Sequence, residues 1–207
     1  MRKSLFFAAL LALVALAPVG AQAGQPVNQA FTCPRGSFLT GLQGHAGNWL
    51  DQFQPICRPW TPAHIGAESY GDNFGNVNGG SPALIRASCA PGAAMFGIDY
   101  NVVSPNGPPG HVQGVSVRCA NLPYFDGVRD VALDGQPGGQ GIFALCGYKN
   151  GKKVGRDDTI ANGLVIGLDG INIASLDVVC DTPANIEAAA PSPIRARFNA
   201  RAIRSVP

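Results

Sequence analysis

Apolar and polar side chains alternate in three short stretches of the chain, each of which ends at a cysteine. Side chains alternate between the two faces of a β-strand, so this pattern predicts strands with one buried face. No long stretch of the chain shows helical periodicity. Counting back from Cys57, Cys119 and Cys180, the second and fourth positions are Pro55/Phe53, Val117/Val115 and Val178/Leu176, and the third and fifth are Gln54/Gln52, Ser116/Gly114 and Asp177/Ser175.

The six cysteines recur with nearly one period. The first series is spaced by 56 and 57 residues and the second by 62 and 61. Such self-similarity indicates a repeated supersecondary unit that closes a core only together with its neighbours. We therefore predict one β domain over residues 24–182, with repeats of about 24–79, 80–137 and 138–182. The two series are Cys33, Cys89, Cys146 and Cys57, Cys119, Cys180.

Glycines keep the same register as the cysteines. The first two copies read Cys33-x-x-Gly36-x4-Gly41-Leu42 and Cys89-x-x-Gly92-x4-Gly97-Ile98, and we expect a looser version from Cys146 through Gly151 and Gly155. Glycine-rich turns also precede the first cysteine of each copy. An extended segment should then lead into each cysteine. These turns are Gly24, Gly79-Gly80 and Gly138-Gly139.

The first 23 residues read as a signal peptide. Arg2 and Lys3 form a positive region, residues 5–17 are apolar, and residues 21–23 (Ala-Gln-Ala) are a small-residue cleavage site. Gly24 becomes the mature N-terminus, and the mature protein is expected to be periplasmic or secreted. No later segment reaches the roughly 20 apolar residues of a transmembrane helix.

Charge and composition narrow the function classes. The 15 basic and 13 acidic residues give a net charge of +2, and removing Arg2 and Lys3 makes the mature chain neutral, which argues against a nucleic-acid partner. Residues 183–207 are rich in Ala, Pro and Arg, and we predict a disordered tail there. The alternative is that its arginines bind a protein or an anionic surface. They are Arg195, Arg197, Arg201 and Arg204.

An exported chain with six cysteines is expected to be oxidised. Fifteen pairings are possible in principle. Pairing within each copy is preferred because it respects the threefold repeat and closes loops of similar length. Pairing between copies also respects the repeat, so that alternative stays open. The preferred pairs are Cys33–Cys57, Cys89–Cys119 and Cys146–Cys180.

Two motifs resemble known families. Residues 39–53 follow the pattern apolar-x-Gly-x5-Gly-x-x-apolar-Asp-x-apolar and resemble the terminal hairpin of jacalin-related lectins. The cysteine-bracketed copies resemble the vitelline membrane outer layer proteins, and residues 155–164 are similar to their Gly-Asp-Asp-Thr-Ala-Leu-Asn-Gly stretch. The resemblance implies an all-β, threefold pseudo-symmetric β-prism, in which three small antiparallel sheets surround one core. The alternative is a β-trefoil or another closed Greek-key domain.

The lectin resemblance implies a sugar-binding loop at Gly47-Asn48-Trp49-Leu50-Asp51, with Gly24 in a neighbouring turn. A fixed carboxylate accepts hydroxyl hydrogen bonds, amides donate them, and an indole offers an apolar face to a sugar ring. Gln113 and Ala174 replace the aspartate in the other copies, so at most one complete site is expected. The alternative is that the aspartate only caps a tight turn.

Other polar residues are expected to be structural. We predict no metal site or cofactor, because the acids lack calcium-loop spacing and the histidines lack partners at ligand spacing. The acids and residues 71–80 should form solvated or mobile turns, and the histidines should lie at the surface. These residues are Asp126, Asp130, Asp134, Asp157, Asp158, His45, His64 and His111.

The function indicated by these patterns is that of an exported, non-catalytic, lectin-like module that binds a glycan or envelope polysaccharide. The alternative is a structural or protein-interaction module of a bacterial envelope or secretome. A hydrolase with paired carboxylates is a third possibility, which no motif favours.

Overall fold

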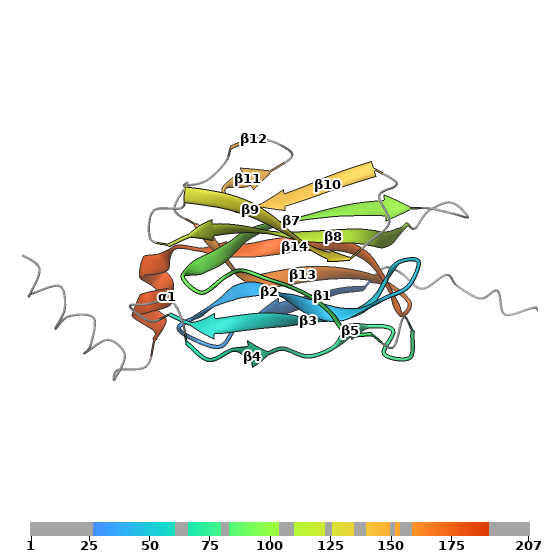
Figure 1. Cartoon of the computed structure of the whole chain (residues 1–207), viewed down its shortest axis with the longest axis horizontal. Coiled ribbons are helices and arrows are strands. Elements are labelled where there is room, and N and C mark those ends of the chain that lie inside the picture. Colours follow the sequence, from blue (N-terminus) through green and yellow to red (C-terminus); the bar gives the residue numbers. More distant parts are fainter. Residues whose placement is uncertain are drawn as a thin grey trace, which may run out of the picture.

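The computed structural model describes residues 27–60, 66–79, 83–103, 110–122, 126–134, 140–149, 152–153 and 159–190. The predicted signal peptide, Gly24 and His64 lie outside these residues. Three long antiparallel hairpins form the frame of the described part (Figure 1). They are β2 (Ser37–Ala46) with β3 (Leu50–Pro59), β7 (Ala93–Val103) with β8 (His111–Asn121), and β13 (Ile160–Asp169) with β14 (Asn172–Asp181).

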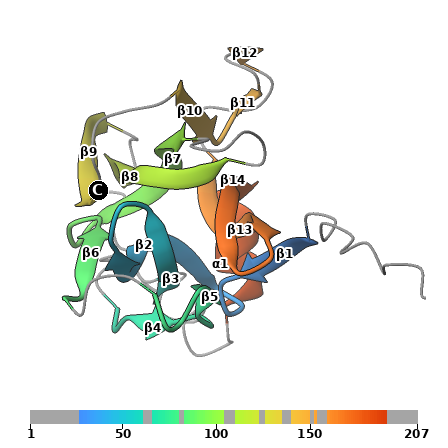
Figure 2. The same ribbon diagram turned by 90° about the vertical axis from the view of Figure 1, so that its right-hand side faces the viewer.

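Each hairpin is extended into a sheet by strands from elsewhere in the chain. In the described residues the three sheets have the strand orders β4-β3-β2-β6, β10-β7-β8-β9 and β1-β13-β14, and β5 also pairs with β3. Viewed from one end, the sheets form the sides of a triangular column around a common core (Figure 2). The added strands are β1 (Val27–Thr32), β4 (Ser69–Tyr70), β5 (Phe74–Gly75), β6 (Ile85–Ser88), β9 (Asp126–Asp134) and β10 (Gln140–Leu145).

The copies exchange strands. The extended segment before each first cysteine pairs with the hairpin of the preceding copy: β6 with β2, and β10 with β7. Strand β1 pairs with β13 of the last copy, which closes the ring. Each sheet is therefore built from two copies, as expected of a repeat that cannot bury its core alone.

A bulge at the same place in each hairpin shows the threefold equivalence. The bulged residues Thr40, Phe96 and Asn162 are skipped in the hairpin pairing. The carbonyl oxygen of each accepts a hydrogen bond from the backbone N–H of a first cysteine. The bonds are Cys89 to Thr40 (2.7 Å), Cys146 to Phe96 (2.8 Å) and Cys33 to Asn162 (2.8 Å).

One part of the predicted register is wrong. Gly41 and Gly97 follow the bulges of the first two hairpins, and their counterpart in the third is Gly163, where we expected Gly155. At all three positions an added Cβ would collide with the adjacent strand from the other copy. Glycine is therefore required wherever this strand packs closely.

An insertion explains the error. Strands β2 and β7 begin four residues after the first cysteine of their copies, whereas β13 begins fourteen residues after Cys146. The inserted segment carries a two-stranded ribbon, β11 (Tyr148–Lys149) with β12 (Lys152–Lys153). The motif at residues 155–164 is described only in part. Its residues 155–158, which include Asp157 and Asp158, lie outside the described residues.

The core confirms the predicted alternation. Phe53, Val117 and Leu176 are almost fully buried, whereas Gln54, Ser116 and Asp177 are half-buried or exposed. The cluster that fills the column draws side chains from all three hairpins. Its fully buried members include Leu39, Leu42, Phe53, Met95, Ile98, Val112, Val117, Ala161, Leu164 and Ile166.

The disulfides confirm the pairing within copies. Cys33 is bonded to Cys57, Cys89 to Cys119 and Cys146 to Cys180, with Cα–Cα distances of 5.8, 5.5 and 5.6 Å. Each bond joins the segment that enters a copy to the second strand of that copy's hairpin. In the chain-entropy account, loops of 24 to 34 residues each stabilise the fold by roughly 3 to 4 kcal/mol.

The prediction that the chain is disordered from residue 183 onward is wrong for the first residues of this segment. Residues Pro183–Ala189 form helix α1, and Thr182 is its N-cap, with a side-chain oxygen that accepts a hydrogen bond from the N–H of Asn185. Ile186 is buried with Phe38, Trp60, Ala94 and Ile160, which explains why this segment is ordered. The helix closes one end of the column, and the tip of the β2–β3 hairpin lies at the other end (Figure 1). Residues 191–207, with the four arginines, lie outside the described part.

In the described part of the chain, no helix is both long enough and apolar enough to cross a membrane.

Candidate functional site

The predicted sugar-binding loop forms the tip of the β2–β3 hairpin. Gly47 and Asn48 are exposed, Trp49 and Asp51 are partly exposed, and Leu50 is only 3% exposed. The side chain of Leu50 therefore belongs to the core, and only its backbone is available to a ligand. The other four residues of this motif, Gly47, Asn48, Trp49 and Asp51, lie together at one end of the column.

Asp51 is fixed by its own turn. The backbone N–H of Gly47 donates to Oδ2 of Asp51 at 2.9 Å and to the carbonyl oxygen of Trp49 at 3.0 Å. This is the turn-capping role considered as the alternative. It occupies one carboxylate oxygen and orients the other, so capping and ligand binding are compatible.

A second segment packs against this carboxylate. The N–H of Asn76 donates to the backbone carbonyl of Asp51 at 2.7 Å. Gly75 has a φ of +95°, and a Cβ there would lie 2.2 Å from the same carbonyl oxygen. A Cβ on Gly79 would lie 2.8 Å from Oδ1 of Asp51. Glycine is therefore needed at position 75, and the missing side chain of Gly79 leaves room for the carboxylate of Asp51.

This glycine turn was not expected at the site. The expected neighbour, Gly24, lies outside the described residues, so its role stays a prediction. Gly79 and Gly80 were recognised as a turn before Cys89, but nothing local in the sequence places that turn beside Asp51. The placement follows from the pairing of β5 with residues Gln52 and Phe53 of β3.

Trp49 lies across the boundary between two sheets. Its ring centroid is 5.3 Å from that of His111, the first residue of β8, with an interplanar angle of 37°. His111 is half-buried, and its Nδ1 is buried without a hydrogen-bond partner among the described residues. The expectation of an ordinary surface histidine is therefore wrong for His111. Packing against the imidazole restricts the indole of Trp49.

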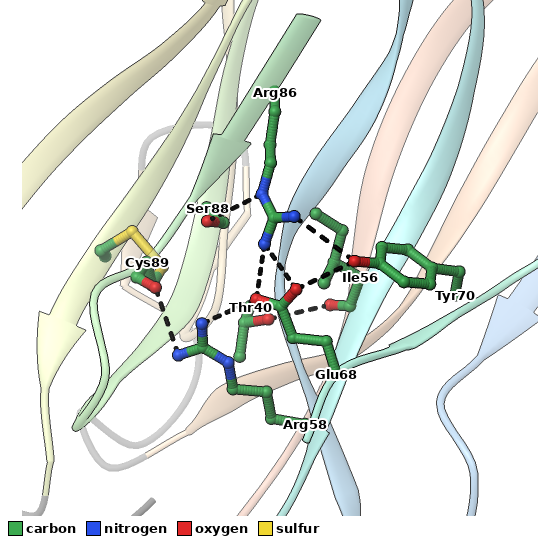
Figure 3. Close-up of polar contacts among 9 residues, drawn as sticks. Thr40, Ile56, Arg58, Glu68, Tyr70, Arg86, Ser88 and Cys89 are labelled. Atoms are coloured by element: carbon green, nitrogen blue, oxygen red, sulfur yellow. Dashed lines mark hydrogen bonds and ion pairs between the residues drawn. A yellow bond between two sulfur atoms is a disulfide. The ribbon is translucent and has the colours of Figure 1, made fainter. Parts of the chain in front are cut away.

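A dense polar cluster lies on the outside of the same sheet, toward its other end. Arg58 and Arg86 both bond to the carboxylate of Glu68, and the hydroxyl of Tyr70 donates to it at 3.1 Å (Figure 3). Arg58 is only 8% exposed and also donates to the carbonyl oxygen of Cys89. We call Arg58, Glu68, Tyr70 and Arg86 the Glu68 cluster.

The carboxylate of Glu68 is held in its ionised form by its neighbours. Burial raises the pKa of Glu68, but hydrogen bonds from Arg86, Arg58 and Tyr70 outweigh burial and hold the pKa below its ordinary value. Both carboxylate oxygens are already hydrogen-bonded. A carboxylate in this state is a poor general acid or base. The cluster instead fastens residues 68–70 across β3 to β6.

The acidic residues at positions 126–134 were predicted to lie in turns, but they belong to a strand. Asp126, Asp130 and Asp134 lie in β9, and Asp130 forms an ion pair with Arg118 on β8 at 3.1 Å. The sequence did not suggest a strand there because β9 has no simple alternation. No group of three or more His, Cys, Asp or Glu side chains within the described residues could hold a metal ion.

The comparisons with known proteins agree with this architecture. By sequence, the chain matches no protein-family model and no curated protein. Its fold is similar to that of the prostate-specific WGA16 glycoprotein lectin, with 14% identity, a TM-score of 0.51, and coverage of 77% of this chain and 94% of that chain.

Two further solved structures are similar. Jacalin in a complex with T-antigen is 11% identical and has a TM-score of 0.51, with coverage of 74% of this chain and 98% of that chain. Calystegia sepium agglutinin is 11% identical and has a TM-score of 0.50, with coverage of 77% and 91%. The chain therefore has the β-prism fold of the jacalin-related lectins, as its motifs predicted, and is not a β-trefoil.

Proposed function

We propose that this protein is an exported, non-catalytic carbohydrate-binding module whose binding site is the tip of the β2–β3 hairpin. Asp51 accepts hydrogen bonds from sugar hydroxyls, Trp49 packs against the apolar face of the sugar, and exposed backbone at Gly47 and Asn48 adds polar contacts. The observation that carries the proposal is the capped carboxylate of Asp51 beside a partly exposed indole.

Four features support this function. Asp51 is held by Gly47 and by the turn at residues 75–79, so its carboxylate needs little ordering when a ligand binds. The indole is restricted by His111, which has the same effect. Jacalin, which has a similar fold, binds T-antigen in its complex. Three disulfides are typical of proteins in oxidising compartments, which supports export after cleavage of residues 1–23.

An Asp51→Asn variant tests the site without removing the turn cap, because the amide oxygen still accepts the hydrogen bond from Gly47. The oxidised protein is first screened on a glycan array, and the dissociation constant of the best ligand is then measured by calorimetry. Losing the charged acceptor should weaken binding by about 10- to 100-fold. The midpoint of thermal unfolding should stay nearly unchanged.

Asp169→Asn is the matched control, because Asp169 ends β13 next to the tip of another hairpin and loses the same charge. It should leave the affinity unchanged. If Asp51→Asn and Asp169→Asn bind the ligand equally well, the site is wrong. If no glycan binds the unsubstituted protein, the alternative of a structural or protein-interaction module is favoured instead.

A further inference from the structure

The outer face of the sheet β10-β7-β8-β9 carries an exposed aromatic ring. Phe143 on β10 is 62% exposed, although it lies in a strand of the sheet. The strand register places it beside Asp99 of β7 and, one strand further, Ser116 of β8. The next row across the sheet holds Arg118 and Asp130. An aromatic ring left open among polar side chains is a common feature of binding surfaces.

Arg118 is held at its inner nitrogen. Its Nε donates to Oδ2 of Asp99 at 2.8 Å and is 3.1 Å from Oδ1 of Asp130. The guanidinium carbon lies 5.4 Å from the ring centroid of Phe143, within the range of a cation–π contact. Among the described residues, the two terminal nitrogens of Arg118 make no hydrogen bond.

Asp99 positions Arg118 at some expense to stability. Its Oδ1 is buried and has no hydrogen-bond partner among the described residues. Burial raises the pKa of Asp99, Arg118 lowers it, and Asp130 raises it, so the net shift is upward. A buried polar atom without a partner is uncommon in folded proteins. Its retention here is consistent with a functional surface.

We propose that this face is a second saccharide-binding site, in which a neutral pyranose stacks on Phe143 and its hydroxyls bond to Arg118 and Asp130. The side chains of Arg118 and Asp130 are 27% and 51% exposed, so both reach a ligand on the surface. With Asp99, the three charges sum to −1, which disfavours uronates, sulfates and phosphates. A pairing of carboxylate, guanidinium and aromatic ring suits neutral hydroxyl groups.

This site is separate from the hairpin tip and does not depend on it. The tip uses Trp49 and Asp51 of the first sheet, whereas the second site uses the outer face of the second sheet. A molecule with both sites would be bivalent toward a polysaccharide. Bivalent attachment raises the apparent affinity without any new contact.

The test starts from a Trp49→Ala/Asp51→Asn double variant, in which the tip site is disabled. Neutral hexasaccharides of β-1,3-glucan, β-1,4-glucan, mannan and galactan are titrated, with hexagalacturonate as the acidic probe. The Nε–H resonance of Arg118 is followed by NMR. At least one neutral probe should shift this resonance, and hexagalacturonate should not.

Adding Phe143→Ala to the double variant should weaken that binding by about tenfold or more. Leu84→Ala is the matched control, because Leu84 is 59% exposed and directly precedes β6, which belongs to the first sheet. It should leave binding unchanged. The proposal is overturned if no neutral probe moves the Arg118 resonance, or if Phe143→Ala behaves like Leu84→Ala. It is also overturned if Phe143→Ala changes only the oligomeric state, since that would identify a protein contact.

Failure of this proposal is distinguishable from failure of the hairpin-tip site. The hairpin-tip proposal is judged in the unsubstituted background, by comparing Asp51→Asn with Asp169→Asn. The second site is judged only in variants that lack the tip.

Discussion

Replacing Glu68 with alanine is expected to lower the free energy of unfolding by about 3 to 5 kcal/mol. Arg58 is almost fully buried, and its ion pair with Glu68 at 2.7 Å is the main compensation for its charge. Without the carboxylate, two guanidinium groups face each other across the sheet. Urea unfolding of the oxidised protein, followed by circular dichroism, measures the loss.

Two further variants define the origin of this loss. Tyr70→Phe removes the hydrogen bond from the hydroxyl to Glu68 and the longer one (3.4 Å) from Arg86 to that hydroxyl, but leaves every charge in place, and should cost about 1 kcal/mol. Arg58→Met combined with Glu68→Met removes both buried charges and should recover most of the stability. If Glu68→Ala were no worse than Tyr70→Phe, the cluster would be a surface feature of little energetic weight.

The Glu68 cluster also predicts a dependence on pH. The pKa of Glu68 is lowered in the folded protein, so its contribution is present above the ordinary pKa of a glutamate, about 4.3. The contribution is lost as the pH falls through the lower, folded-state pKa. Between neutral pH and strong acid, the unsubstituted protein should therefore lose more stability than the Arg58→Met/Glu68→Met variant. Equal losses would contradict this assignment.

Replacing Gly41 with alanine is the second change with a large expected effect. A Cβ at Gly41 would lie 2.2 Å from the backbone oxygen of Ala87 and 2.6 Å from Cα of Ser88, so β6 would have to move away from β2. Steric crowding of this kind costs about 3 kcal/mol or more when backbone must shift. Chemical denaturation of the oxidised variant measures the loss.

Gly141→Ala is the control for Gly41→Ala. Gly141 lies in β10, which pairs with β7 as β6 pairs with β2, but an added Cβ would meet nothing closer than Oδ1 of Asn101 at 3.6 Å. Its stability should change by less than about 1 kcal/mol. Similar losses in both variants would show that glycine is needed for backbone freedom, and not for the close approach of strands.

Much of the three-hairpin frame could be predicted, because it follows from features that repeat along the sequence. The cysteine spacing and the alternation before Cys57, Cys119 and Cys180 predicted the hairpins, the disulfide pairing and the threefold arrangement. The glycine register failed in the third copy, because the inserted ribbon moved Gly163 away from its expected distance to Cys146. Helix α1 was missed because seven residues are too few to show helical periodicity.

The candidate site was only half predictable. The tip from Gly47 to Asp51 is a local motif, so its residues could be named from the sequence. Its neighbours could not, because Gly79 reaches Asp51 through the pairing of β5 with β3, and His111 reaches Trp49 through the packing of two sheets. The same limit applies to Phe143 and Arg118, which become neighbours only through the pairing of β10, β7 and β8.

The order of the disulfides has a consequence for how the chain matures. Every cysteine is bonded to the next or the previous one along the chain, so a polypeptide that emerges from its N-terminus can complete each bridge before the following pair appears. The ring, in contrast, cannot close early, because β1 is made first and its partner β13 comes near the end. Newly made chains should therefore pass through a state in which the first two disulfides are formed and the ring of sheets is still open.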